Sequence, residues 1–270
     1  LVHSEMGICH VTYTLPGPIH GLTIDCGTAS NVIPGEAQAS LSRDAVPCAA
    51  PEGMEAAFHG GVIRVKGFGG HAASPELAQN AMQGLLQVLT EQPLGAEAFA
   101  LVSSLNALLD FDRHGEGFGL DVTDASGTLT LVPSMLHVGE DGVSLTLDCR
   151  FPFAVTPEHL LAALDASFNA IGFERTDTEV KAGHFIDPNS ELVQTLLSVY
   201  ERHVGHRSAP LSIGGGTYAR GFKNAVAFGV IREGEDSCCH MPNESIGVED
   251  IRFNTNVMAE AIALLAGAKS

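Results

Sequence analysis

The stretch TLTLVPSMLHVGEDGVSLTLDCRFPF, residues 128–153, decides the fold class of this 270-residue chain. Two apolar, strand-like runs flank the segment from Gly139 to Gly142, which has the glycine and acidic residues of a tight turn. The pattern therefore predicts a hairpin of two antiparallel strands. Such a hairpin is stable only when further strands or a helix cover its apolar face.

Three amphipathic helices are predicted around this hairpin. The first begins at Ser74 and Pro75, a good N-cap and first-turn pair. The other two cover residues 97–113 and about 156–170, and the last of them is opened by a Thr-Pro-Glu sequence. The order of strands and helices predicts a compact α+β unit over residues 56–180, an antiparallel sheet with helices on one face.

The flanking segments predict a second, α/β unit. Residues 1–55 read as strands separated by loops, and they open within a strand pattern, so we expect a further part of the sheet upstream. Residues 181–270 are expected to contain helix 189–204, strand 225–231 and helix 248–267. The predicted architecture is therefore an α/β domain that is interrupted by a smaller α+β lid domain.

Charge and composition limit the partners and the compartment. With 14 Lys+Arg against 32 Asp+Glu, the net charge of −18 would repel a phosphate backbone, so nucleic acid is not an expected partner. No apolar run reaches the roughly 18 residues that span a bilayer, and the N-terminal sequence does not resemble a signal peptide. We therefore expect no membrane contact and a cytoplasmic location. The six cysteines form no CxxC pair, which indicates reduced thiols.

Five short motifs together resemble a known family. They are ASNVIPGEA (29–37), VKGFGGHAASPELAQNA (65–81), LDCRFP (147–152), SIGGGTYAR (212–220) and CCHMPNESIGVEDI (238–251). Their residues, order and spacing are similar to those of PepV-type zinc dipeptidases, which belong to a superfamily of cocatalytic zinc aminoacylases, carboxypeptidases and deacylases. The resemblance implies that residues 1–55 and 181–270 are the remnant of a catalytic domain and that residues 56–180 are its lid.

The resemblance also implies roles for two histidines. His240 corresponds to the C-terminal zinc ligand of the family, although a lone histidine is otherwise an ordinary surface or core residue. His71 matches the lid histidine that polarises the scissile carbonyl and stabilises the oxyanion. Without the family match, His71 would be an exposed histidine in a glycine-rich loop. We therefore expect a catalytic role for His71 and a metal-binding role for His240.

Six further residues are expected to bind substrate. Arg150 resembles the arginine that holds the free carboxylate of the substrate, a task that suits a planar guanidinium. Because Arg150 shares a strand face with Asp148, a structural salt bridge is the alternative. Asn31 corresponds to an asparagine that contacts a carbonyl or carboxylate oxygen, and its alternative is a turn residue. The glycine loop in SIGGGTYAR (212–220) lacks the spacing of a nucleotide-binding loop.

The resemblance implies that four residues of this loop contact the carboxylate end of the substrate: Gly215, Gly216, Thr217 and Arg220.

The chain lacks other groups that the family uses to hold metal. A cocatalytic dizinc site needs an HxD pair and a Glu-Glu pair, and neither occurs in this sequence. The complete enzyme implied by the resemblance holds two zinc ions and hydrolyses dipeptides, and the partner of this chain is the missing N-terminal half. The chain alone is expected to be inactive and to bind no zinc tightly. The alternatives are an N-acyl-amino-acid deacylase of the same superfamily and a non-catalytic peptide-binding or oligomerisation module.

Overall fold

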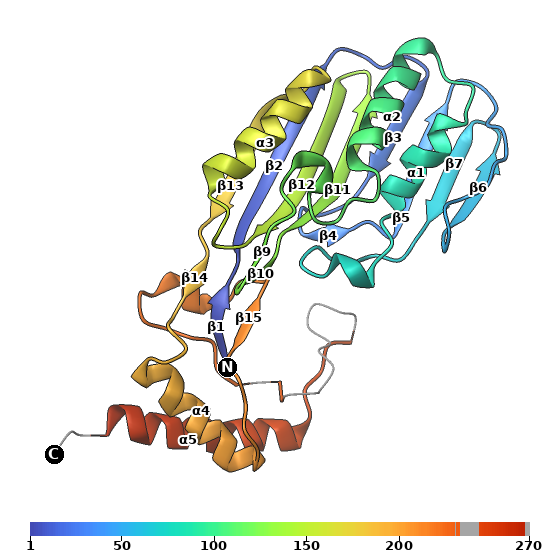
Figure 1. The fold of residues 1–270 in the computed structure, drawn as a ribbon. Helices are drawn as coiled ribbons and strands as arrows, with labels where there is room; N and C mark the ends of the chain where they lie inside the picture. The colour runs from blue at the N-terminus through green and yellow to red at the C-terminus, as the bar shows by residue number, and fades with distance from the viewer. Residues whose placement is uncertain (230, 233–242, 268–270) are drawn as a thin grey trace. The chain divides into compact units, whose positions relative to one another are not determined.

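The chain forms two compact units in the computed structural model, which describes residues 1–229, 231–232 and 243–267 (Figure 1). Unit 1 comprises Leu1–Glu5 and Gly183–Ser270, and unit 2 comprises Met6–Ala182. Among the described residues, no helix combines the length and the apolar character that a membrane span requires.

Unit 2 is built on an eight-stranded sheet in which every neighbouring pair is antiparallel. Its order is β13-β2-β12-β11-β3-β5-β7-β6. The strands are β2 (Gly7–Pro16), β3 (Leu22–Cys26), β5 (Glu36–Leu41), β6 (Glu55–His59), β7 (Val62–Lys66), β11 (Thr130–Gly139), β12 (Gly142–Phe151) and β13 (Glu174–Lys181). The adjacent strands β11 and β12 form the predicted hairpin, with Gly139 opposite Gly142, so this prediction is confirmed.

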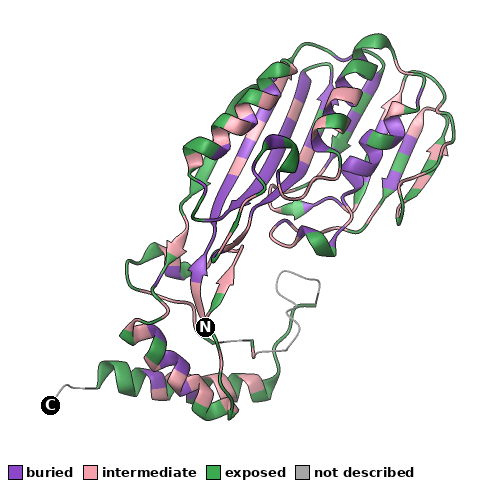
Figure 2. Cartoon of the chain, viewed as in Figure 1, coloured by how far each residue is buried: buried purple, intermediate pink, exposed green. Residues whose placement is uncertain are grey.

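Three helices cover one face of this sheet: α1 (Ala81–Thr90), α2 (Ala96–Leu109) and α3 (Pro157–Ala170) (Figure 1). In β3, β5 and β7, buried residues alternate with less buried ones, because side chains of a strand point in turn to its two faces (Figure 2). In β2, for example, Tyr13 stacks on Phe168 of α3 with ring centroids 4.2 Å apart. An antiparallel sheet with helices on one face is therefore confirmed, whereas its role as a lid stays a prediction.

The boundary expected at residue 55 differs from the division seen in the structure. Strands β2, β3 and β5 all precede this residue, yet they pair within the same sheet as β7 and β12. Only Leu1–Glu5 join the C-terminal flank in unit 1. The sequence does not show this division because the neighbours of β2 are distant in the chain, with His10 opposite Asp148. Unit 2 ends at Ala182, close to the expected residue 180.

The first helix begins later than the sequence pattern indicates. Ser74 makes no side-chain capping hydrogen bond and precedes only a 3-10 turn, η1 (Pro75–Leu77). The chain then returns to an extended conformation, because Phe68 and Gln79 exchange two backbone hydrogen bonds. The N-cap of α1 is Asn80, whose side chain accepts a hydrogen bond from a backbone N–H of the first turn. The backbone pairing of Gln79 with Phe68 therefore precedes the helix, which begins after Asn80.

In unit 1, the described residues form a three-stranded sheet and two α-helices. The sheet order is β14 (His184–Phe185), β1 (Val2–Glu5) and β15 (Leu211–Ile213), with β1 antiparallel to β14 and parallel to β15. Helices α4 (Glu191–Val204) and α5 (Val248–Ala266) pack through a small apolar core, and both were predicted. The strand predicted at 225–231 does not form in its described part, where Ala227 makes only an isolated bridge with Val2.

Candidate substrate-binding site

Asn31 and His71 are brought together by a short ladder in unit 2. Strand β4 (Val32–Ile33) pairs antiparallel with β8 (Gly70–His71), and the Asn31 carbonyl accepts a hydrogen bond from the Ala72 N–H at 3.0 Å. The glycines of the GFGG sequence permit this close approach. A Cβ at Gly69 would lie 2.8 Å from the Ile33 carbonyl oxygen, which a real side chain does not tolerate.

The imidazole of His71 is half-buried and is held by a backbone hydrogen bond. Its Nδ1 accepts from the Ala73 N–H at 3.1 Å. In the neutral ring, this bond is compatible with the tautomer that carries its proton on Nε2. An Nε2–H group is the kind of donor that stabilises negative charge on a carbonyl oxygen, as the resemblance implies for His71.

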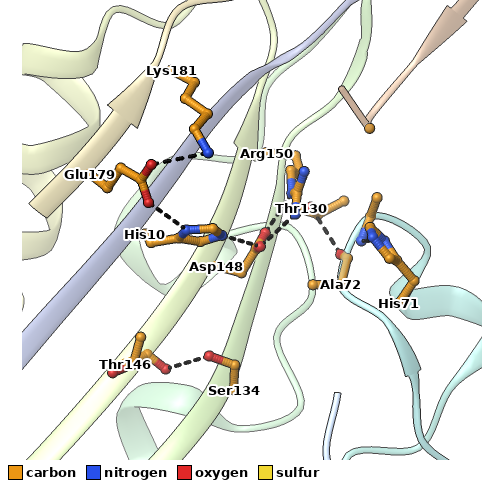
Figure 3. A network of polar contacts seen from close by, with 12 residues as sticks. His10, His71, Ala72, Thr130, Ser134, Thr146, Asp148, Arg150, Glu179 and Lys181 are labelled. Atoms are coloured by element: carbon orange, nitrogen blue, oxygen red, sulfur yellow. Dashed lines mark hydrogen bonds and ion pairs between the residues drawn. The ribbon is translucent and has the colours of Figure 1, made fainter. Parts of the chain in front are cut away.

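Arg150 lies near the same turn. In the sheet it is opposite Thr130, and the Thr130 hydroxyl donates to the Ala72 carbonyl at 3.5 Å (Figure 3). The Arg150 guanidinium makes two 2.6 Å hydrogen bonds to Asp148, from Nε to Oδ1 and from Nη2 to Oδ2. Their side chains are only 4% and 0% exposed, respectively. The salt bridge considered as the alternative for Arg150 is therefore present, and the carboxylate-binding role stays a prediction.

A row of charged groups continues from Asp148 across the neighbouring strands β12, β2 and β13 (Figure 3). His10 Nε2 lies 2.9 Å from Asp148 Oδ2, and His10 Nδ1 lies 3.5 Å from Glu179. Lys181 Nζ lies 3.0 Å from Glu179. The hydrogen bond with Asp148 raises the pKa of His10, and burial opposes this effect. Lys181, and then His10, lower the pKa of Glu179.

This row was not predicted beyond the Asp148–Arg150 pair. Period-two spacing within one strand is visible in the sequence and places Asp148 beside Arg150. The contact of Asp148 with His10 depends on the register between β2 and β12, which no local pattern specifies.

In unit 1, the glycine loop binds a carboxylate of the chain itself. Glu5 is 1% exposed and accepts hydrogen bonds from the Thr217 N–H at 3.0 Å, from the Thr217 hydroxyl and from Arg220 Nε at 2.8 Å. Arg220 Nη2 also donates to the Gly215 carbonyl at 3.2 Å. A Cβ at Gly216 would lie 3.0 Å from the Arg220 guanidinium carbon, so glycine makes room for this cation. Substrate contacts by these four loop residues stay predictions.

Glu5 was missed by the sequence analysis. It lies at the end of a strand beside apolar residues, in SEMGI, and nothing in that segment identifies its distant partners. A single acidic residue in an apolar strand was the available signal, because a buried carboxylate requires a cation or several hydrogen-bond donors.

The predicted site residues thus fall into two groups. Asn31, His71 and Arg150 gather in unit 2, and the glycine-loop residues gather around Glu5 in unit 1. His240 lies outside the described residues. Within the part of the chain that is described, no three His, Cys, Asp or Glu side chains lie where they could hold a metal ion. The groups described therefore do not fit zinc by themselves.

Curated relatives of the chain are named as dipeptidases, while no protein-family model matches it. The chain is 33% identical over 216 residues to "Putative dipeptidase YtjP" of Bacillus subtilis, an alignment that covers 78% of the chain and 46% of that protein. It is 30% identical over 203 residues to "Putative dipeptidase SH1171" of Staphylococcus haemolyticus. This alignment covers 74% of the chain and 43% of the relative. The chain thus spans less than half the length of these relatives.

A solved structure supports the fold. The dipeptidase Dug1p from Saccharomyces cerevisiae superimposes with a TM-score of 0.52, at 11% identity, over 100% of this chain and 56% of the yeast chain. At this identity the likeness concerns the fold alone. The chain is therefore similar to dipeptidases in sequence and to one dipeptidase in fold, and the predicted resemblance to dipeptidases is confirmed at that level.

Proposed function

We propose that this chain supplies the substrate-holding part of a zinc-dependent dipeptidase, with unit 2 (Met6–Ala182) acting as the lid. The observation that carries the proposal is the match to two curated relatives named as dipeptidases, over 74% and 78% of the chain. The complete enzyme is proposed to use two zinc ions, with His240 as one ligand. The other ligands and the general base belong to a part of the protein outside the described residues.

Within unit 2, three residues are proposed to hold the dipeptide. Arg150 binds its C-terminal carboxylate, His71 donates to the carbonyl oxygen of the scissile bond, and Asn31 assists at an adjacent oxygen. The ladder β4–β8 and the Thr130–Ala72 hydrogen bond support this grouping, because they place all three residues near one turn. The contribution of His71 is greatest in the transition state, when negative charge develops on the carbonyl oxygen.

The experiment joins this chain to the part of the Bacillus subtilis relative that the alignment leaves uncovered, and assays zinc-dependent hydrolysis. We expect hydrolysis of free dipeptides and its loss in His71→Ala. His137→Ala is the matched control, because His137 is an exposed histidine of unit 2 opposite Ser144, away from the proposed site. Hydrolysis of N-acyl amino acids alone would identify a deacylase, and a folded protein without either activity would identify a binding module.

A further inference from the structure

One carboxylate oxygen links Arg150 to a histidine near solvent. Asp148 Oδ2 lies 2.6 Å from Arg150 Nη2 and 2.9 Å from His10 Nε2. Asp148 is fully buried, whereas the His10 side chain is 19% exposed. A proton can therefore exchange between His10 and water, and its charge acts on Arg150 through a single buried carboxylate.

The charged groups facing His10 come from both neighbouring strands. Asp148 and Arg150 lie on β12, and Glu179 and Lys181 lie on β13. On β11, the residue opposite Asp148 is the apolar Val132. The charges of these four side chains sum to zero. The cluster is therefore neutral when His10 is neutral and carries one positive charge when His10 is protonated. The side chains of Glu179 and Lys181 are 58% and 50% exposed, so solvent screens their contribution.

We propose that Asp148 and His10 are positioning residues for Arg150, and that the proton on His10 sets how strongly Arg150 attracts a carboxylate ligand. The inference rests on the proposed function, in which Arg150 holds the carboxylate of a dipeptide. With His10 protonated, two cations share the charge of Asp148, and Arg150 is less fully compensated. With His10 neutral, the negative charge of Asp148 is not shared with a charged His10. It therefore compensates Arg150 more fully, and Arg150 attracts an incoming carboxylate less strongly.

Two effects follow from this arrangement. Affinity for a free carboxylate decreases as pH rises through the titration of His10, by about 2- to 5-fold for a unit charge acting over several ångströms in a partly screened site. Because coupling between two binding events is reciprocal, a bound carboxylate raises the pKa of His10 by the corresponding amount.

The test uses nuclear magnetic resonance on the full 270-residue chain, from about pH 5 to pH 8.5, with alanyl-alanine and its C-terminal amide as probes. In the ligand-free chain, the Arg150 Nε–H signal should titrate with the same midpoint as the His10 ring. In His10→Gln, that signal should be independent of pH, because the amide can still donate to Asp148 but does not titrate. The control His137→Gln removes a histidine from the same sheet face and should behave as the wild type.

Binding of the two probes distinguishes the inferred role of His10 from the proposed role of Arg150. Alanyl-alanine should bind the wild type more weakly at high pH, bind His10→Gln with constant affinity, and raise the His10 midpoint, whereas the amide should show none of these effects. An Arg150 signal that ignores His10 titration would overturn the inference. So would carboxylate affinity with the same pH dependence in wild type and His10→Gln. A shared titration without carboxylate binding at any pH would instead overturn the proposed role of Arg150 and, with it, the ligand part of the inference.

Discussion

The Glu5 carboxylate accepts a hydrogen bond from Arg220 Nε at 2.8 Å. This bond joins strand β1 to the glycine loop, which lies more than 200 residues later in the chain. Glu5 is buried, and the Thr217 N–H and hydroxyl complete its set of donors. Charge-assisted hydrogen bonds of this kind are stronger than neutral ones. The glycine loop of unit 1 is therefore held by a carboxylate that the chain itself supplies.

Glu5→Gln should destabilise unit 1 by about 3 kcal/mol, because the change removes the negatively charged partner of a buried ion pair with Arg220. Hydrogen exchange of the unit 1 amides measures the loss. The matched control is Glu249→Gln, since Glu249 and Arg252 form an exposed pair and should cost less than about 1 kcal/mol. Equal protection in the two variants would show that Glu5 contributes no more than a surface acid.

Asn80→Ala should destabilise unit 2 by about 1–3 kcal/mol. The change removes the N-cap of α1 and also a buried hydrogen bond from Asn80 Nδ2 to the Pro133 carbonyl at 2.7 Å. Ser74→Ala is the control and should have almost no effect, because Ser74 makes no capping bond. Urea unfolding followed through unit 2 amide signals distinguishes them. A larger loss of stability for Ser74→Ala than for Asn80→Ala would indicate that the helix begins at Ser74, as expected from the sequence.

Unit 2 should lose stability as pH rises above about 6.5, the ordinary value for histidine. The hydrogen bond with Asp148 raises the pKa of His10 in the folded state, so the folded state holds the proton more tightly than the unfolded chain. This stabilisation is complete below the unfolded pKa and disappears as pH passes through the folded one. In urea unfolding at a series of pH values, His10→Gln should remove this component. An unchanged pH dependence in the variant would assign it to other groups.

The sequence predicted those elements whose signals are local. The β11–β12 hairpin, the cap of α3 and helices α2, α4 and α5 all follow from apolar periodicity, turn residues or capping residues within one segment. The assignment of β2, β3 and β5 to the large sheet depends on strand pairing over long separations, which periodicity does not encode.

The same distinction applies to the candidate site. Asp148 was found beside Arg150 because both lie on one strand. The partners that define the surroundings of these residues, His10 for Asp148 and Glu5 for Arg220, come from segments far apart in the chain. Motif resemblance identified residues of interest, but it did not show that several of them bind carboxylates of this chain.

His71 should act mainly on the rate of the chemical step. In the enzyme joined to the uncovered part of the Bacillus subtilis relative, His71→Ala should lower kcat by about 10²–10³ with KM nearly unchanged, because charge on the carbonyl oxygen develops only in the transition state. Free and amidated dipeptides should be affected alike. The 270-residue chain alone is the blank and should hydrolyse no dipeptide with zinc present. Zinc-dependent turnover by this chain alone would contradict the proposal that it supplies only the substrate-holding part of the enzyme.

The central claim is that Arg150 recognises the C-terminal carboxylate of a dipeptide, and kcat/KM of the joined enzyme for a free dipeptide and for its C-terminal amide tests it most directly. For the free dipeptide, Arg150→Ala should raise KM and lower kcat/KM by an amount equivalent to about 2–4 kcal/mol, because the clamp both binds and positions the substrate. For the amide, which has already lost the recognised group, the same change should cost little. Equal losses for the two substrates would contradict the claim and leave Arg150 as the structural partner of Asp148.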